Sequence, residues 1–162
     1  MKLKKLTELA LLTAVALIIF IIELRFPDMI PIAGVKLGLA NIITVYAVFH
    51  YKPNETAMLV FCRVLLGAIF GANLTALFYS LSGAILCLFG MLIIKKFIPE
   101  NYIWLCSILG AVLHNIGQIL VAMLVTRTIL VISYLPILII SGCIAGLFTG
   151  LCAQMLIKRL EK

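Results

Sequence analysis

The stretch LTALFYSLSGAILCLFGMLII, from Leu74 to Ile94, contains no charged side chain. A helix needs about 20 consecutive apolar residues to cross the hydrocarbon core of a bilayer, so this stretch predicts a membrane-spanning helix. The whole chain of 162 residues is 65% hydrophobic and 12% charged, with a mean hydropathy of +1.27. Because a soluble domain is about half apolar and about a quarter charged, this composition excludes a water-soluble globule.

The rest of the chain divides in the same way. Six apolar segments can be drawn, at about residues 6–22, 37–49, 56–70, 74–94, 102–125 and 129–157. The second is short for a span, and the sixth contains Pro136, which predicts a kink or a shallow entry segment there. We therefore expect residues 1–162 to form a single transmembrane domain, an all-α integral membrane protein with six transmembrane helices.

Basic residues divide unequally between the two sides of such a bundle. If the N-terminus is cytoplasmic, the outside carries Arg25, Lys36 and Arg127, and Arg63 lies within a span. The inside carries Lys2, Lys4, Lys5, Lys52, Lys95, Lys96, Lys158, Arg159 and Lys162. Cytoplasmic loops are enriched in Lys and Arg, so we expect both termini to be cytoplasmic. The net charge of +7 then reflects these loops, and no nucleic-acid partner is expected.

Polar side chains within a membrane are costly, so each one is a candidate for function. Arg63 lies near the middle of the third segment, and a guanidinium can donate two parallel hydrogen bonds to a carboxylate or phosphate. Asn115 and Gln118 share one face of the fifth segment, which His114 can join. The alternative is structural: Arg63 pairs with a carbonyl or an Asn, and the amides hold helices together.

Further polar residues fall at or near the outer ends of the predicted helices, and these are Lys36, Asn41, Asn73 and Arg127. Together with the polar residues of the third and fifth segments, they are expected to converge on an outward-facing cavity, covered by the connection of residues 23–36. The residues predicted to bind a small solute are Lys36, Asn41, Arg63, Asn73, Asn115 and Gln118. The basic residues near this cavity favour an anion.

Small residues recur four apart on three of the predicted helices. These stripes are Ala10 and Ala14 on the first, Gly67 and Gly71 on the third, and Gly142, Gly146 and Gly150 on the sixth. Such faces let helix backbones approach closely in a membrane. We expect the glycine stripes to pack within the bundle, whereas Ala10 and Ala14 either do the same or dock another membrane protein.

The chain lacks the motifs of nucleotide-driven or metal-dependent chemistry. There is no Walker-type glycine loop, and Asp28 is the sole aspartate, so paired aspartates for magnesium diphosphate chemistry are missing. His50 and His114 fall at different depths, so neither a metal site nor a cofactor is expected. Apart from Glu23 at a helix end, no carboxylate lies at membrane depth, where an ion-driven carrier usually has one. These observations favour a binding protein over an enzyme.

The run from Pro31 to Asn41, PIAGVKLGLAN, resembles the signature of a bacterial membrane family labelled heptaprenyl diphosphate synthase component I or Gx transporter. Residues 61–67, FCRVLLG, and 114–118, HNIGQ, resemble further parts of that pattern. The family in turn resembles the substrate-binding S components of energy-coupling factor (ECF) transporters. This resemblance implies six helices, cytoplasmic termini, an extracellular ligand pocket, and an alanine pair, matched by Ala10 and Ala14, that meets the transmembrane T component.

Three functions remain open. The favoured one is an S component in the bacterial cytoplasmic membrane, which captures a small solute and delivers it with a T component and two ATPase subunits. The second is a non-catalytic membrane subunit associated with heptaprenyl diphosphate synthase and isoprenoid metabolism. The third is a freestanding carrier of small solutes. Prenyl synthases of the usual kind need aspartate-rich magnesium sites, so we expect no catalysis by this chain.

Overall fold

The computed structural model describes residues 3–25, 38–71 and 74–160, and its regular elements are helices throughout. The α-helices are α1 (Leu3–Glu23), α2 (Asn41–His50), α3 (Pro53–Phe70), α4 (Leu74–Ile94), α5 (Ile103–Thr126) and α6 (Leu135–Leu160). Two short 3-10 helices, η1 (Glu100–Tyr102) and η2 (Ile129–Tyr134), precede α5 and α6. The all-α class and the six helical segments are confirmed.

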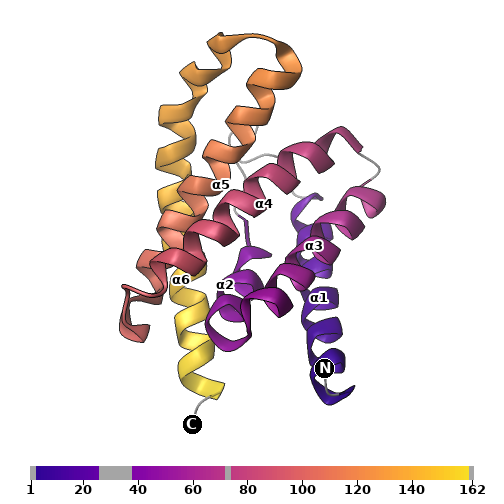
Figure 1. Cartoon of the computed structure of the whole chain (residues 1–162), viewed down its shortest axis with the longest axis vertical. Coiled ribbons are helices and arrows are strands. Elements are labelled where there is room, and N and C mark those ends of the chain that lie inside the picture. The colour runs from indigo at the N-terminus through magenta and orange to yellow at the C-terminus, as the bar shows by residue number, and fades with distance from the viewer. Residues whose placement is uncertain (1–2, 26–37, 72–73, 161–162) are drawn as a thin grey trace.

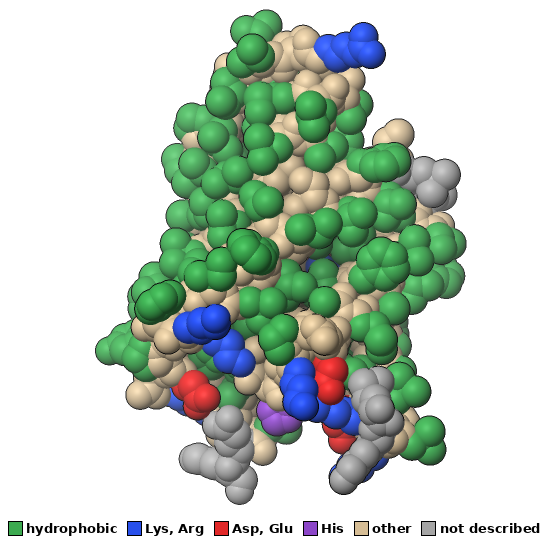
Figure 2. All heavy atoms as spheres, in the orientation of Figure 1, with side chains coloured by type: hydrophobic (Ala, Val, Ile, Leu, Met, Phe, Trp, Pro, Cys, Tyr) green, Lys and Arg blue, Asp and Glu red, His purple; other side chains and the backbone are tan. Residues whose placement is uncertain are grey.

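Among the described residues, five helices (α1, α3, α4, α5 and α6) are long and apolar enough to cross a membrane. Large apolar side chains cover the sides of the bundle (Figure 2), including Phe89 at 67% exposed and Leu124 at 77% exposed. Exposed apolar surface on this scale marks contact with lipid rather than water. The chain is therefore a multi-pass membrane protein.

The second segment differs from the expected span. α2 has 10 residues, a length of about 15 Å, whereas the hydrocarbon core is about 30 Å thick. The expected start near residue 37 was wrong, because Gly38 has a left-handed backbone with φ of 66° and the helix begins only at Asn41. Residues 43–48 of α2 are all buried, so its apolar character reflects packing inside the protein as well as the membrane.

The other end of α2 is capped by Lys95, the residue that follows α4. The ammonium of Lys95 donates hydrogen bonds to the carbonyl oxygens of Val48 at 2.7 Å and Phe49 at 3.3 Å. The last carbonyls of a helix have no intrahelical donor, and a cation there also opposes the helix dipole favourably. Lys95 thus fixes α2 within the bundle.

The sixth segment begins with a separate turn. η2 leads into α6, and Pro136 is the second residue of that helix. A proline in the first turn leaves no hydrogen bond unmade, because the first N–H groups have no intrahelical acceptor. A separate segment before α6 is confirmed, while its shallow position in a membrane stays a prediction. The alternative of a kink within the helix was wrong, because Pro136 lies in the first turn.

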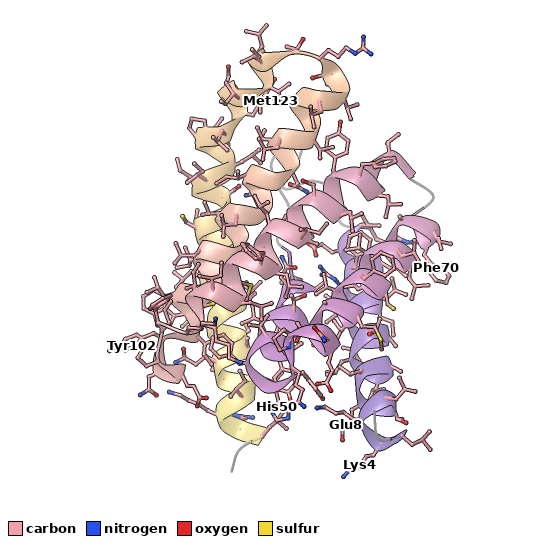
Figure 3. The ribbon with its side chains drawn as sticks, viewed as in Figure 1. Lys4, Glu8, His50, Phe70, Tyr102 and Met123 are labelled. Atoms are coloured by element: carbon pink, nitrogen blue, oxygen red, sulfur yellow. The ribbon has the colours of Figure 1, made fainter. Side chains whose placement is uncertain are left out.

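α1 begins and α6 ends at the same end of the bundle (Figure 1), which we call the terminal end. Figure 2 shows charged side chains gathered at this end, and Figure 3 places Lys4, Glu8 and His50 there, opposite Met123. This arrangement agrees with the expectation that both termini lie on one side of the membrane, while the number of passes stays a prediction. Which side of the membrane the terminal end faces stays a prediction, and Lys2 and Lys162 lie outside the described residues.

The glycine stripes pack inside the bundle, as predicted. A Cβ atom added to Gly150 would lie 2.5 Å from the Cα of Trp104, so α6 meets α5 backbone to backbone. A Cβ added to Gly67 would lie 3.0 Å from the ring of Phe20, so the stripe on α3 receives α1. Such close approach gains the van der Waals contact that holds helices together in lipid.

Candidate solute-binding cavity

A cavity of about 180 Å³ lies among the helices, and all six α-helices contribute to its wall. Glycine and alanine residues of α3 and α6 make the space for it. Its polar lining side chains are Glu23, Asn41, Arg63, Ser80, His114, Asn115, Gln118 and Thr149. A protein cavity of about 150 Å³ holds a molecule the size of benzene, so this one has room for a small solute.

Arg63 is the most deeply buried charge in the wall, with only 9% of its surface exposed. Its Nη1 donates a hydrogen bond to Oδ1 of Asn41 at 3.3 Å, and its Nε has no hydrogen-bond partner among the described residues. The structural alternative, pairing with an Asn, is therefore partly correct. A buried charge without full pairing is costly, so the guanidinium is poised for a further acceptor.

The turn before α2 brings Asn41 to Arg63. The carboxylate of Glu23, the last residue of α1, accepts hydrogen bonds from the amides of Gly38 and Leu39. The carbonyl of Gly38 in turn accepts the amide of Asn41 at 2.8 Å. Glu23 thereby joins the end of α1 to the start of α2 at the edge of the cavity.

Glu23 was not among the residues predicted to bind solute. It was noted only as a carboxylate at a helix end. A signal for it existed, because the partial negative charge at the C-terminal end of a helix repels a carboxylate there, which then needs a partner. The partner is the backbone of the next turn, and the same carboxylate lines the cavity.

The fifth helix contributes three polar residues to one wall, as predicted from their spacing. His114, Asn115 and Gln118 all line the cavity. Asn115 donates from Nδ2 to the carbonyl of Leu138 at 2.6 Å, so the structural alternative of an interhelical hydrogen bond is correct for that amide. Gln118 has a buried Oε1 with no hydrogen-bond partner among the described residues.

The expected convergence of the basic residues was wrong for Arg127. Arg127 is exposed and has a left-handed backbone with φ of 50° at the end of α5. It follows Gln118 by nine residues, about 13 Å along a helix, and it does not belong to the described lining of the cavity. Lys36 and Asn73 lie outside the described residues, as does most of the connection 23–36.

The alanine pair on α1 does not pack within the described part of the chain. Ala10 and Ala14 are both exposed, whereas Leu9, Thr13 and Ala16 on the other face of α1 are buried. Of the two alternatives for this stripe, packing inside the subunit was wrong. Docking to another membrane protein stays a prediction.

Polar groups at the terminal end are paired with one another. Lys5 and Glu55 form a salt bridge of 2.8 Å, and the hydroxyl of Tyr51 donates to Glu8 at 3.5 Å. Burial, with Tyr46 and these carboxylates nearby, raises the pKa of Tyr51 to about 12. These contacts join α1 to the turn between α2 and α3.

The side chains that line the cavity suit the binding of a small solute. Within the described ranges, no group of three or more His, Cys, Asp or Glu side chains is placed to hold a metal ion. The polar groups of the wall are instead hydrogen-bond donors and acceptors spread over several helices. Such a wall orients a solute by complementary contacts.

Residues 12–156 match the family described as Heptaprenyl diphosphate synthase component I. The chain belongs to this family. The match runs from α1 to α6, so it includes every described residue that lines the cavity. It confirms the resemblance of the sequence motifs to this family, whereas the resemblance to ECF S components stays a prediction. The name of the family implies a partner enzyme component. No curated protein and no solved structure matches the chain.

Proposed function

We propose that this chain is a non-catalytic membrane component that captures a small solute in its cavity by an anionic group of that solute. Arg63 carries the proposal. Its guanidinium is buried, lines the cavity and has an unpartnered Nε. Since guanidinium matches carboxylate and phosphate through parallel hydrogen bonds, an anionic group is the acceptor that completes it.

The size of the cavity limits the solute. About 180 Å³ holds a molecule of a few heavy atoms beyond benzene, whereas a chain of seven isoprene units is several times larger. The cavity therefore supports binding of a small water-soluble molecule and argues against the heptaprenyl product as its occupant.

The family favours one partner. A protein described as component I of a synthase implies a second, enzymatic component. The chain would then serve prenyl diphosphate synthesis as a membrane subunit, bringing a solute to the enzyme while the chemistry takes place on the partner. This reading needs no magnesium site on the chain itself.

A second candidate partner is the ECF module, a T component with two ATPase subunits. The exposed pair Ala10 and Ala14 on α1 favours it, because small residues facing lipid offer a surface for close helix packing. In that case the chain acts as a substrate-binding S component of an importer in the bacterial cytoplasmic membrane.

Co-purification distinguishes the partners. The full chain, tagged and extracted in mild detergent from the cells that make it, is expected to retain either a prenyl synthase subunit or a T component with ATPases. Ala14→Trp is the informative variant, since it should release the T component but not a soluble enzyme. Solute uptake by vesicles containing this chain alone would contradict both readings and support a freestanding carrier.

The capture step has its own test. Small molecules released from the purified full chain are compared by mass spectrometry with those from Arg63→Ala. A compound with an anionic group should be present on the natural chain and depleted well over tenfold on the variant, because losing a buried charge-assisted hydrogen bond costs about 2–5 kcal/mol. Equal amounts on both would remove Arg63 from the site.

A further inference from the structure

The described residues of the cavity wall include one charge of each sign. Of the described lining residues, Arg63 supplies a positive charge and Glu23 a negative one, with no other Lys, Arg, Asp or Glu among them. Arg63 and Glu23 do not form a salt bridge with each other. Among the described residues, the observed ion pair joins Lys5 to Glu55. The wall thus presents separate positive and negative groups.

Both charged groups keep capacity for a ligand. Arg63 gives Nη1 to Asn41 and leaves Nε unpartnered. Each oxygen of the Glu23 carboxylate accepts one backbone amide. Because a carboxylate has about four lone-pair sites, Glu23 can still accept from a donor inside the cavity.

A second acceptor lies on α5. The Oε1 of Gln118 is buried without a partner among the described residues. A ligand that satisfies it must donate a hydrogen, whereas the Nε of Arg63 requires an acceptor. Carboxylates and fully ionised phosphates only accept hydrogen bonds, so neither group alone completes the wall.

The two described charges favour the same class of ligand. A simple anion on Arg63 would be repelled by the carboxylate of Glu23 in a low-dielectric cavity, which is costly. A zwitterion places an opposite charge against each of the two groups. A diphosphate, with several negative charges, is the least compatible with one guanidinium and one carboxylate.

On the basis of the proposed function, we infer that the solute is a small zwitterion, with its anionic group on Arg63 and its protonated nitrogen facing Glu23 and Gln118. This assigns Glu23 and Gln118 as specificity-determining residues. They select against anions of the same size that lack the nitrogen.

The first test is the identity of the bound compounds. Molecules released from the purified full chain and depleted on Arg63→Ala are expected to carry both an anionic group and a protonated nitrogen. Depleted compounds that are simple anions would overturn this inference and leave the proposed function standing. Depletion of no compound would count against both.

The second test removes the negative charge of Glu23. The probe is the depleted compound, paired with the same compound lacking its nitrogen, and both are titrated onto Glu23→Gln. This substitution keeps the shape and one acceptor oxygen but removes the negative charge of Glu23. The ratio of the two affinities should fall by about tenfold or more. Glu8→Gln, the same change at the terminal end of the same helix, should leave the ratio unchanged.

Gln118→Leu supports the test independently of the turn that Glu23 holds. It removes the buried acceptor without touching α1, so it should weaken binding of the zwitterion more than binding of its nitrogen-free analogue. If folded Glu23→Gln and Gln118→Leu both keep the natural ratio, neither residue selects the nitrogen and the inference is wrong.

Discussion

Polar side chains at the terminal end and in the cavity differ in how fully they are paired. At the terminal end, Lys5 pairs with Glu55, and Lys95 donates to two carbonyls of α2. In the cavity, Arg63 and Gln118 each keep a buried polar atom with no partner among the described residues. Paired groups stabilise the fold, whereas unpaired buried groups cost free energy unless a ligand completes them. Thr44 and Gln154, which are not among the described lining residues, also keep a buried oxygen without a described partner. It is therefore the combination of an unpaired group with the cavity that marks Arg63 and Gln118 as functional.

α2 connects the two regions. Its C-terminal carbonyls are held by Lys95, and its first residue, Asn41, contacts Arg63. A helix of 10 residues is marginal by itself. Its C-terminal end depends on its cap, whereas Asn41 at its start is held by the turn that Glu23 binds.

Arg63→Ala should produce the largest change and should affect binding alone. We expect affinity for the co-purified solute to fall by about 2–5 kcal/mol, while the protein still folds because the lost group was incompletely paired. Binding can be measured by isothermal titration in detergent. Arg159→Ala, an exposed arginine at the terminal end, is the matched control and should bind normally.

Lys95→Met should lower stability and leave affinity unchanged, which is the reverse of the effect expected for Arg63→Ala. Removing the cap leaves two helix carbonyls without their charged donor, and hydrogen bonds to charged groups contribute about 1.5–3 kcal/mol each. The midpoint of thermal unfolding should fall, while the folded fraction keeps its affinity. Lys96→Met, at the exposed neighbouring position, should change neither. A loss of affinity in folded Lys95→Met would erase the distinction between the two regions.

Tyr51 should make the stability of the terminal end depend on pH. Its pKa in the folded protein is about 12, above the ordinary value of 10.0. A raised pKa means that the protonated group favours folding, so this contribution is present below about pH 10 and is lost as the pH rises towards about 12. Unfolding midpoints of the natural chain and Tyr51→Phe should therefore converge across that window. A constant difference would place the stabilisation in packing instead.

Ala14→Trp should have the smallest effect on the isolated chain. Ala14 is exposed on α1, and surface substitutions usually change stability by less than about 0.5 kcal/mol. Unfolding and solute binding should both stay near their natural values, while retention of a membrane partner is lost. Gly150→Trp, on the stripe that meets the backbone of Trp104, should instead prevent folding. Destabilisation by Ala14→Trp would assign that face to the fold.

Much of the fold follows from hydropathy alone. The predicted segment 74–94 coincides with α4, and the other long helices end within a few residues of their predicted bounds. Hydropathy identified the second segment as short for a span, but it did not predict that the helix begins only at Asn41. Its start depends on the left-handed turn at Gly38, which hydropathy does not report.

The candidate site was predicted in part. Arg63, Asn41, Asn115 and Gln118 do line one cavity, because polar groups within apolar helices turn away from lipid. The prediction for Arg127 was wrong because it did not take into account how far α5 extends beyond Gln118. Glu23 was missed because its neighbours in space, the amides of the turn before α2, cannot be identified from spacing along the chain.

The shift of the unfolding midpoint on adding the co-purified solute tests the central claim most directly, because a ligand stabilises only the folded state that binds it. The natural chain and Lys95→Met should show equal upward shifts from different starting midpoints. Arg63→Ala should start near the natural midpoint and show no shift. An equal shift in Arg63→Ala would contradict the claim that the unpaired guanidinium in the cavity is what captures the solute.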